Sequence, residues 1–239
     1  MPSVVTLRVE ESLRFLLPAR RRGAEVVLAH DGTSSLGHVV ESAGVPLTEV
    51  GELRRGAEVV ATSHRPRASE VFDVLPVRRP QPLPDPAGFL LDVHLGALAR
   101  RMRLLGLDTA YSNDADDDEL AAEARSTGRV LLTQDRGLLR RRAVPQGAYV
   151  RGTSADAQLA DVLDRFAPPL APWTRCTRCN GTLAPAEKGE VEHELEPGTR
   201  SSYQEFARCT ECSRVYWRGA HAAELQAVVE RHTPDWESQ

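Results

Sequence analysis

Two proline-rich stretches limit what this chain can fold into. Prolines occupy every second position from 80 to 86 in RRPQPLPDPAG, and three more fall within FAPPLAPW at residues 166–173. Proline fixes its own φ angle and has no N–H for a helix or a strand ladder, so neither stretch continues a regular element. We therefore expect separate parts, with limits at 1–78, a spacer at 79–87, then 88–167 and 168–239.

The first part alternates apolar and polar residues. SVVTLRVEESLRFLL and AEVVLAHDG predict two strands, joined near the basic turn at 20–23. Ser34 or Ser35 can cap a short helix that Gly44 ends, and AEVVAT and SEVFDVLPV predict two further strands. This ββαββ order resembles the β-grasp fold of ubiquitin-like sulfur carriers. Such carriers are activated on a terminal Gly-Gly that this module lacks, so we expect a binding or packing role in place of conjugation.

The middle part alternates strands with helices. FLLDV at 89–93 is a short apolar strand, and further strands are predicted over 107–112, 129–133 and 147–152. The first intervening helix has an apolar face formed by Leu95, Leu98, Met102 and Leu105. This order predicts an α/β fold with a parallel sheet covered by helices on both faces.

Aspartates follow the first three of these strands. Asp92 ends the first, the run NDADDDE (113–119) follows the second, and Asp135 follows the third. The carboxyl ends of parallel strands share one edge of a sheet, where ligands bind. Carboxylates that meet there repel one another unless a cation offsets the repulsion, and Mg²⁺ and Mn²⁺ prefer such oxygen ligands. The alternative is helix capping, by Asp116 with Glu119 as its partner and by Asp135.

A family resemblance supports the metal site. Residues 89–139 are similar to the PIN-like ribonuclease domain at the C-terminus of the Mut-seven exonuclease family, through Asp-x-x-Leu-Gly-x-Leu-Ala-Arg, Leu-Gly-x-Asp, Asp-x-x-Leu and Leu-Leu-Thr-x-Asp. The flanking β-grasp and cysteine modules resemble usual neighbours of that family. The resemblance implies an RNA-cleaving fold in which Asp92, Asp117 and Asp135 bind metal, with Asp114 and Asp116 as reserves in the same run. Gln134 departs from the family, which often has a basic residue there.

All four cysteines lie in the last part. Cys176 and Cys179 form one Cys-x-x-Cys pair and Cys209 and Cys212 another, with 29 residues between the pairs. This spacing predicts a closed, structural zinc site of four thiolates in a zinc ribbon. ELEPGTRSSYQEFARC suggests a β-hairpin that leads into the second pair. A redox dithiol is the alternative.

No part of the chain is strongly basic. The formal net charge is −4, and every basic residue except Lys188 is arginine. An RNA partner must therefore be held by local side chains and metal ions, and we expect Arg100 and Arg136 to contact phosphates. Tyr216, Trp217, Arg218 and His221 beside the second cysteine pair can stack on bases, although Trp217 is equally suited to sealing the small core of the ribbon.

These features predict a metal-dependent ribonuclease with Mg²⁺ or Mn²⁺ at the aspartates and zinc at the cysteines. The rival hypothesis is a non-catalytic adaptor that binds RNA or ribosomes through the ribbon and the β-grasp surfaces, and a sulfur-transfer partner is a third. The chain has neither an apolar run long enough to span a membrane nor a signal peptide, so we expect a cytoplasmic protein, with a protein partner for the β-grasp module as a further hypothesis. The RNA target, the direction of cutting, the number of catalytic metals, the role of the β-grasp module and the oligomeric state are left open.

Overall fold

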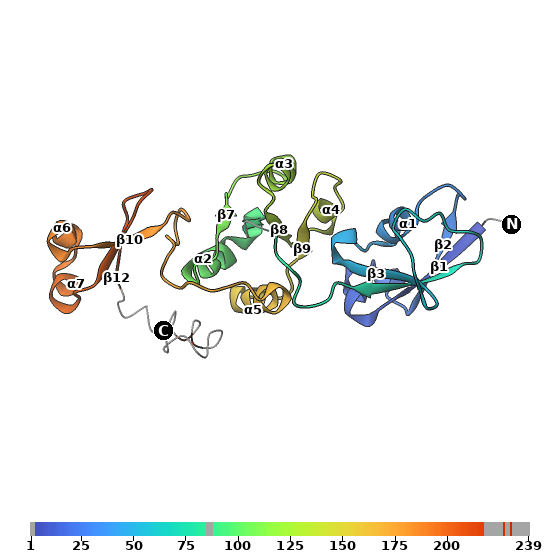
Figure 1. Cartoon of the computed structure of the whole chain (residues 1–239), viewed down its shortest axis with the longest axis horizontal. Coiled ribbons are helices and arrows are strands. Elements are labelled where there is room, and N and C mark those ends of the chain that lie inside the picture. Colours follow the sequence, from blue (N-terminus) through green and yellow to red (C-terminus); the bar gives the residue numbers. More distant parts are fainter. Residues whose placement is uncertain (1–2, 85–87, 218–226, 228–229, 231–239) are drawn as a thin grey trace. The chain divides into compact units, whose positions relative to one another are not determined.

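The computed structural model describes residues 3–84, 88–217, 227 and 230. The chain divides into two compact units, residues 1–82 with 115–151 and residues 83–114 with 152–239. Figure 1 labels the helices and strands, coloured along the sequence. The domain limits expected from the sequence stay a prediction. Within the described part, no helix is both long and apolar enough to cross a lipid bilayer.

The N-terminal module is a five-stranded β-grasp-like sheet, which confirms the fold class predicted for it. Its strand order is β2-β1-β5-β3-β4, with β1 antiparallel to β2 and parallel to β5. The strands are β1 (Ser3–Val9), β2 (Glu25–His30), β3 (Val50–Arg55), β4 (Glu58–Val59) and β5 (Val71–Pro76). Helix α1 (Leu36–Ala43) packs its apolar face into the same core as Leu7 and Phe72, and both side chains are fully buried.

Local signals set the ends of α1. The Ser35 side chain accepts a hydrogen bond from His38 N at 3.3 Å, as expected for an N-cap. Gly44 ends the helix with a φ of 125° and donates to the carbonyl oxygens of Val40 and Glu41. The prediction that a serine at 34 or 35 caps this helix and that Gly44 ends it is therefore confirmed.

One prediction for this module was wrong, and one strand was missed. The first strand does not continue to Leu17, because Glu10 accepts from Ser12 N and starts the 3-10 helix η1 (Glu11–Leu16). Two short 3-10 helices follow elsewhere in the module, η2 (Ala19–Arg21) and η3 (Leu47–Glu49). Strand β3 was not predicted, since its sequence VGELRR is mostly polar; it is stabilised by pairing with β4 and β5 on its two sides.

The middle of the chain forms a four-stranded parallel sheet flanked by helices, as predicted. Strand β6 (Phe89–Leu91) pairs with β7 (Thr109–Tyr111), and β8 (Val130–Thr133) pairs with β9 (Gly147–Tyr149). Residue 89 faces 109 in the first pair, and residue 131 faces 147 in the second. The helices are η4 (Val93–Leu95), α2 (Gly96–Leu104), α3 (Asp117–Thr127), α4 (Arg136–Leu139) and α5 (Ala155–Phe166).

Strand β9 and the β-grasp module belong to the same compact unit and contact each other closely. The Glu49 carboxylate, 1% exposed, accepts from the backbone N of Tyr149 at 2.8 Å. The Phe15 and Tyr149 rings meet edge to face at 5.2 Å, and the Arg151 guanidinium lies 5.0 Å from the centroid of the Phe15 ring. The β-grasp module therefore covers one side of β9.

The cysteine module is a three-stranded antiparallel sheet in the order β10-β11-β12. The strands are β10 (Leu183–Ala186), β11 (Phe206–Cys209) and β12 (Val215–Trp217). The segment predicted as a hairpin, residues 194–209, instead contains α7 (Pro197–Ser202), and only its end forms β11. Two further short helices precede it, α6 (Lys188–Val191) and η5 (Glu192–Glu194). Pro197 suits the first helical position, and Val191 and Leu195 pack with Phe206, so burial overrides the hairpin signal.

Candidate acidic and metal sites

Asp92 follows β6 and is buried, with 7% of its surface exposed. Its backbone carbonyl accepts from Leu95 N at 2.9 Å as η4 begins, but its side chain does not cap that turn. A carboxylate is costly to bury without polar or charged neighbours. A metal-binding role for Asp92 stays a prediction, and its burial is the observation that bears on it.

Asp135 follows β8 and caps α4. Its Oδ1 accepts from Gly137 N at 2.5 Å and from Leu138 N at 3.4 Å, so the capping alternative describes this residue correctly. The buried Thr133 hydroxyl accepts from Asp135 N at 2.8 Å and fixes the backbone there. The Thr-x-Asp spacing of the motif thus has a structural reason that the sequence reading missed.

Neighbouring aspartates of the acidic run make different contacts. Asp116 caps α3 by accepting from Asp118 N and Glu119 N, and Glu119 completes the capping box. Asp117 does not cap; its Oδ2 lies 3.0 Å from Arg141 Nη2, and Arg141 also pairs with Asp118. Asp114 accepts from the Ser112 hydroxyl. Within this run, Asp117 and Asp118 therefore pair with the Arg141 guanidinium, whereas Asp116 accepts from backbone amides.

The structure leaves one part of the prediction open. Asp92 and Asp114 belong to one compact unit, whereas Asp116, Asp117 and Asp135 belong to the other. The convergence of Asp92, Asp117 and Asp135 on one cation stays a prediction. Arg141 is a neighbour of Asp117 that was not predicted from the sequence.

The two arginines expected to contact RNA differ in their surroundings. Arg100 is exposed on α2. Arg136 Nη1 donates to the Leu16 carbonyl oxygen at 2.5 Å, so this nitrogen is engaged by the β-grasp module. The phosphate role of both residues stays a prediction, and Arg136 has a structural use as well.

The four cysteines come together, as predicted. The sulfur atoms of Cys176, Cys179, Cys209 and Cys212 all lie within 4.8 Å of one another. The Cys176–Cys212 and Cys179–Cys209 sulfur distances are 3.6 and 3.5 Å. Tetrahedral Zn–S bonds of about 2.3 Å place sulfurs about 3.8 Å apart, so the cluster can bind zinc with little movement.

The thiol pKa values show why the cluster suits a cation. Burial raises the pKa of Cys176, but hydrogen bonds from the Tyr216 hydroxyl and from the Cys179 backbone amide outweigh it and lower the pKa to about 6. Burial and the neighbouring thiols raise the pKa of Cys179 to about 12. The cluster therefore favours a first thiolate and resists further ones until a cation supplies positive charge.

Arg103 joins the first cysteine pair to the α2–β7 turn. Arg103 is 4% exposed, and its guanidinium donates to the carbonyl oxygens of Thr109, Thr177 and Arg178 at 2.9, 3.3 and 2.7 Å. Burial lowers its pKa, and the nearby Cys179 and Cys176 thiols act in the opposite direction. The burial of Arg103 was not predicted from the sequence. Its burial could have been predicted from its position four residues after Ala99, which places both residues on the buried face of α2.

Asn180 reinforces the same connection. Its side chain accepts from Thr109 N at 3.0 Å and donates to Asp108 at 2.8 Å, and Arg175 also pairs with Asp108. The ribbon is thus attached to the β7 end of the sheet by buried and half-buried polar groups rather than by a flexible tether.

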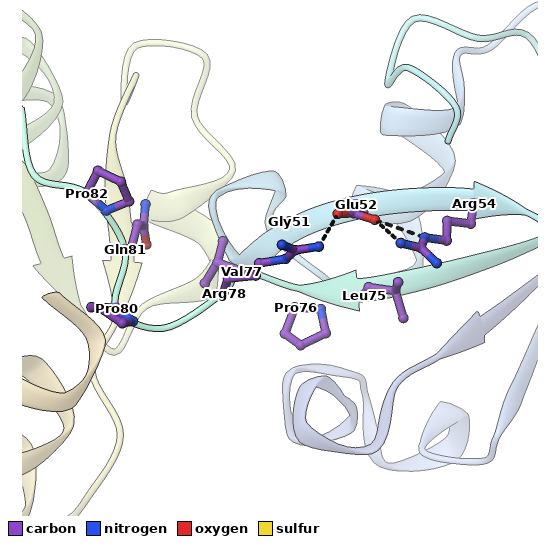
Figure 2. A pocket seen from close by; sticks show the side chains of 10 residues that line it. All are labelled: Gly51, Glu52, Arg54, Leu75, Pro76, Val77, Arg78, Pro80, Gln81 and Pro82. Atoms are coloured by element: carbon purple, nitrogen blue, oxygen red, sulfur yellow. Dashed lines mark hydrogen bonds and ion pairs between the residues drawn. The ribbon is translucent and has the colours of Figure 1, made fainter. Parts of the chain in front are cut away.

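The end of the β-grasp module is held in place instead of being left extended as a conjugation tail. Val77 N donates to the Glu49 carbonyl oxygen, and Arg78 Nη2 lies 3.1 Å from Glu52 Oε1 (Figure 2). Gly51 has no room for a side chain, since a Cβ there would lie 2.4 Å from the Pro76 carbonyl oxygen. A pocket of about 440 Å³ lies between β3, the end of β5 and the proline-rich spacer. This arrangement supports the packing role expected for the module.

Comparisons with known proteins identify two regions. The model of the family described as Mut7-C RNAse domain matches residues 87–229, and the model described as Mut7-C ubiquitin matches residues 2–82. No curated protein and no solved structure gives a significant match. The first match spans both the parallel sheet and the cysteine module.

Proposed function

The chain belongs to the Mut7-C RNAse domain family, and on this premise we propose that it is a metal-dependent ribonuclease. In this proposal Asp92, Asp117 and Asp135 hold Mg²⁺ or Mn²⁺ beside an RNA phosphodiester. The family match over residues 87–229 is the observation that carries the proposal. The burial of Asp92 after β6 and the pairing of Asp117 with the Arg141 guanidinium support it.

The donor set agrees with the metal. Carboxylate oxygens are the ligands that Mg²⁺ and Mn²⁺ prefer, and a divalent ion would activate water and stabilise negative charge on the departing oxygen. Asp135 uses Oδ1 for capping, so we assign its Oδ2 to the cation. Arg141 supplies the positive charge beside Asp117 in this structure, where it offsets the carboxylate as a metal ion would.

The proposed reaction is an in-line displacement at phosphorus. A water oxygen forms a bond to phosphorus while the bond to the leaving ribose oxygen breaks, and the proton that the water gives up is transferred through solvent to that leaving oxygen. The protein side chains hold and orient the reacting groups: Thr133 fixes the backbone of Asp135, and Arg100 is the exposed cation that we assign to a flanking phosphate. The four-cysteine site is proposed to hold a structural zinc ion.

Cleavage of end-labelled single-stranded RNA with Mn²⁺ tests this function. We expect Asp92→Asn, Asp117→Asn and Asp135→Asn each to lower the rate by about 100-fold or more. Asp118→Asn is the matched control, because Asp118 lies in the same turn and also pairs with Arg141 but is 90% exposed at its side chain. Linear and circular RNA substrates would separate cutting from an end and internal cutting.

The adaptor hypothesis remains the second candidate, because Asp116 and Asp135 do cap helices. It predicts RNA binding without cleavage across several RNAs and both metals. Cleavage that survives all three aspartate substitutions would contradict the proposed catalytic residues.

A further inference from the structure

The ribbon contains an aromatic pocket that the proposed catalytic site does not use. Its volume is about 590 Å³, within the range of about 300–1,000 Å³ found for small-molecule sites. Four aromatic residues belong to its lining: Trp173, Phe206, Tyr216 and Trp217. Lys188 and Gln204 also line it, and Lys188 Nζ donates to Gln204 Oε1 at 3.1 Å.

The strand register explains why a hollow forms here. Pro185 lies opposite Ala207 in the β10–β11 pair, and Ala207 lies opposite Tyr216 in the β11–β12 pair. Directly opposed residues of antiparallel strands project from the same face of a sheet. Two small residues beside a tyrosine leave a shallow apolar floor, and Trp173 joins it from the segment before the first cysteine pair.

Trp173 is fixed in an uncommon conformation. Its φ is 66°, in the left-handed region that bulky side chains rarely adopt. Its backbone N donates to the Leu104 carbonyl oxygen at 3.0 Å, and Ala171 N donates to that of Leu105 at 2.9 Å. Residues in such conformations often lie at ligand sites, where the surroundings hold them. The Trp173 wall of the pocket is therefore set by the backbone around it.

The opposite wall is tied to the cysteine cluster. The Tyr216 hydroxyl lies 3.0 Å from Cys176 Sγ, so the position of its ring depends on the metal site. The next residue, Trp217, lies opposite Phe206 in the strand register and also lines the pocket; it is 40% exposed, which is high for a tryptophan. From the sequence, Trp217 was equally suited to stacking on a base and to covering the small core of the ribbon. Its exposure argues against the second role.

We propose that this pocket binds one nucleobase of single-stranded RNA by stacking. The proposal rests on RNA as the substrate class. The Mut7-C RNAse match runs to residue 229, so the family model includes the ribbon. Aromatic surfaces accept any base because every base has a π face, and Glu187 and Glu205 at the lining disfavour a phosphate inside the pocket. The base enters, and the backbone stays outside.

Binding of a short fluorescent single-stranded RNA tests the pocket directly. The measurement uses the full-length, zinc-loaded Asp92→Asn protein without added Mg²⁺ or Mn²⁺, so that the RNA is not cut, and reads anisotropy. Stacking is worth about 1–3 kcal/mol per base, so Trp217→Ala should raise the Kd by about 5- to 150-fold, and Trp217→Phe should restore most of the affinity. Val27→Ala is the control, because Val27 is an apolar side chain 63% exposed on β2 and should leave the Kd unchanged.

The outcomes separate the two proposals. If Trp217→Ala binds RNA as tightly as its parent and retains zinc, the pocket proposal is wrong while the ribonuclease proposal stands. If the Asp92→Asn parent does not bind RNA and the wild-type protein does not cut RNA with Mn²⁺, both proposals fail. If Trp217→Ala loses binding to an arginine-rich peptide and keeps RNA binding, the pocket is a protein-binding site and the nucleobase proposal is overturned.

Discussion

At the scale of single residues, Arg103 explains how the cysteine cluster is joined to the parallel sheet. A buried guanidinium that donates to three carbonyl oxygens satisfies acceptors on both sides of the connection. We expect Arg103→Ala to lower the free energy of unfolding by about 2–4 kcal/mol, because charged hydrogen bonds are lost and buried acceptors are left unpaired. Thermal unfolding with a zinc-release assay measures both effects.

Arg101→Ala is the matched control for that substitution. Arg101 lies on the same helix and pairs with Asp156 at 2.8 Å, but its side chain is about one third exposed. Such surface pairs contribute about 0–1 kcal/mol. Equal losses from Arg101→Ala and Arg103→Ala would contradict the anchoring role of Arg103.

Tyr216 provides a prediction about pH. Its hydroxyl helps to hold the pKa of Cys176 down to about 6, against burial, so the thiolate that binds metal is available above that pH and is lost as the pH falls through it. Tyr216→Phe removes this donor and raises the pKa of Cys176, so protons compete better with zinc. We expect zinc release on acidification to begin at a higher pH, with zinc affinity lower by about 10-fold.

A chromophoric chelator followed across a pH series measures this release. Tyr203→Phe is a suitable comparison, because Tyr203 packs against the apolar core of the same module. An unchanged release curve in Tyr216→Phe would show that the hydroxyl does not support the metal site.

At the scale of elements, helix α3 separates capping from catalysis. Asp116 caps the helix and Asp117 is its first residue. Asp116→Ala should cost about 1 kcal/mol of stability, as N-cap substitutions do, and leave RNA cleavage intact. Asp117→Asn should show the reverse, with stability close to wild type and cleavage lost. Urea unfolding and the cleavage assay on the same samples test the pair, and lost activity in Asp116→Ala alone would move the metal ligand to Asp116.

Elements with strong local signals were predictable from the sequence. Helix α3 has its capping box and Gly128, α1 has Ser35 and Gly44, and β8 is an apolar run between turn residues. Strand β3 was missed because its sequence is mostly polar and carries no apolar alternation, and it is stabilised by pairing with β4 and β5. The helices at 188–202 were missed because their few apolar residues pack in a small core that only the fold assembles.

The candidate sites, too, were predictable from the sequence only in part. Cysteine spacing predicted the four-thiol cluster, since each pair supplies two ligands from one turn. The contacts of Arg103 and Arg141 were not predictable, because they join residues distant along the chain. Helix capping by Asp116 and Asp135 was the alternative interpretation of the sequence, and both residues do cap helices.

At the scale of the whole molecule, the β-grasp module forms one compact unit with residues 115–151. Glu49 accepts from Tyr149 N, and Arg140 and Arg151 donate to the carbonyl oxygens of Glu41 and Ser12. We expect Glu49→Ala to lower stability by about 1–3 kcal/mol, because the Tyr149 N–H loses its acceptor. Hydrogen exchange at Tyr149 should become faster in this variant.

Glu52→Ala controls for the loss of a carboxylate in the same module. Glu52 is more exposed than Glu49 and pairs with Arg54 and Arg78, which both lie outside β9. Exchange at Tyr149 that is equally fast in both variants would show that Glu49 does not secure β9.

The central claim is that three aspartates distant along the chain share one divalent cation. Anomalous diffraction from crystals of the full-length protein grown with Mn²⁺ tests it most directly. The account predicts a manganese peak in contact with carboxylate oxygens of Asp92, Asp117 and Asp135, which disappears in Asp92→Asn. A peak that avoids these carboxylates, or their oxygens engaged only by backbone amides and arginines at saturating Mn²⁺, would contradict it.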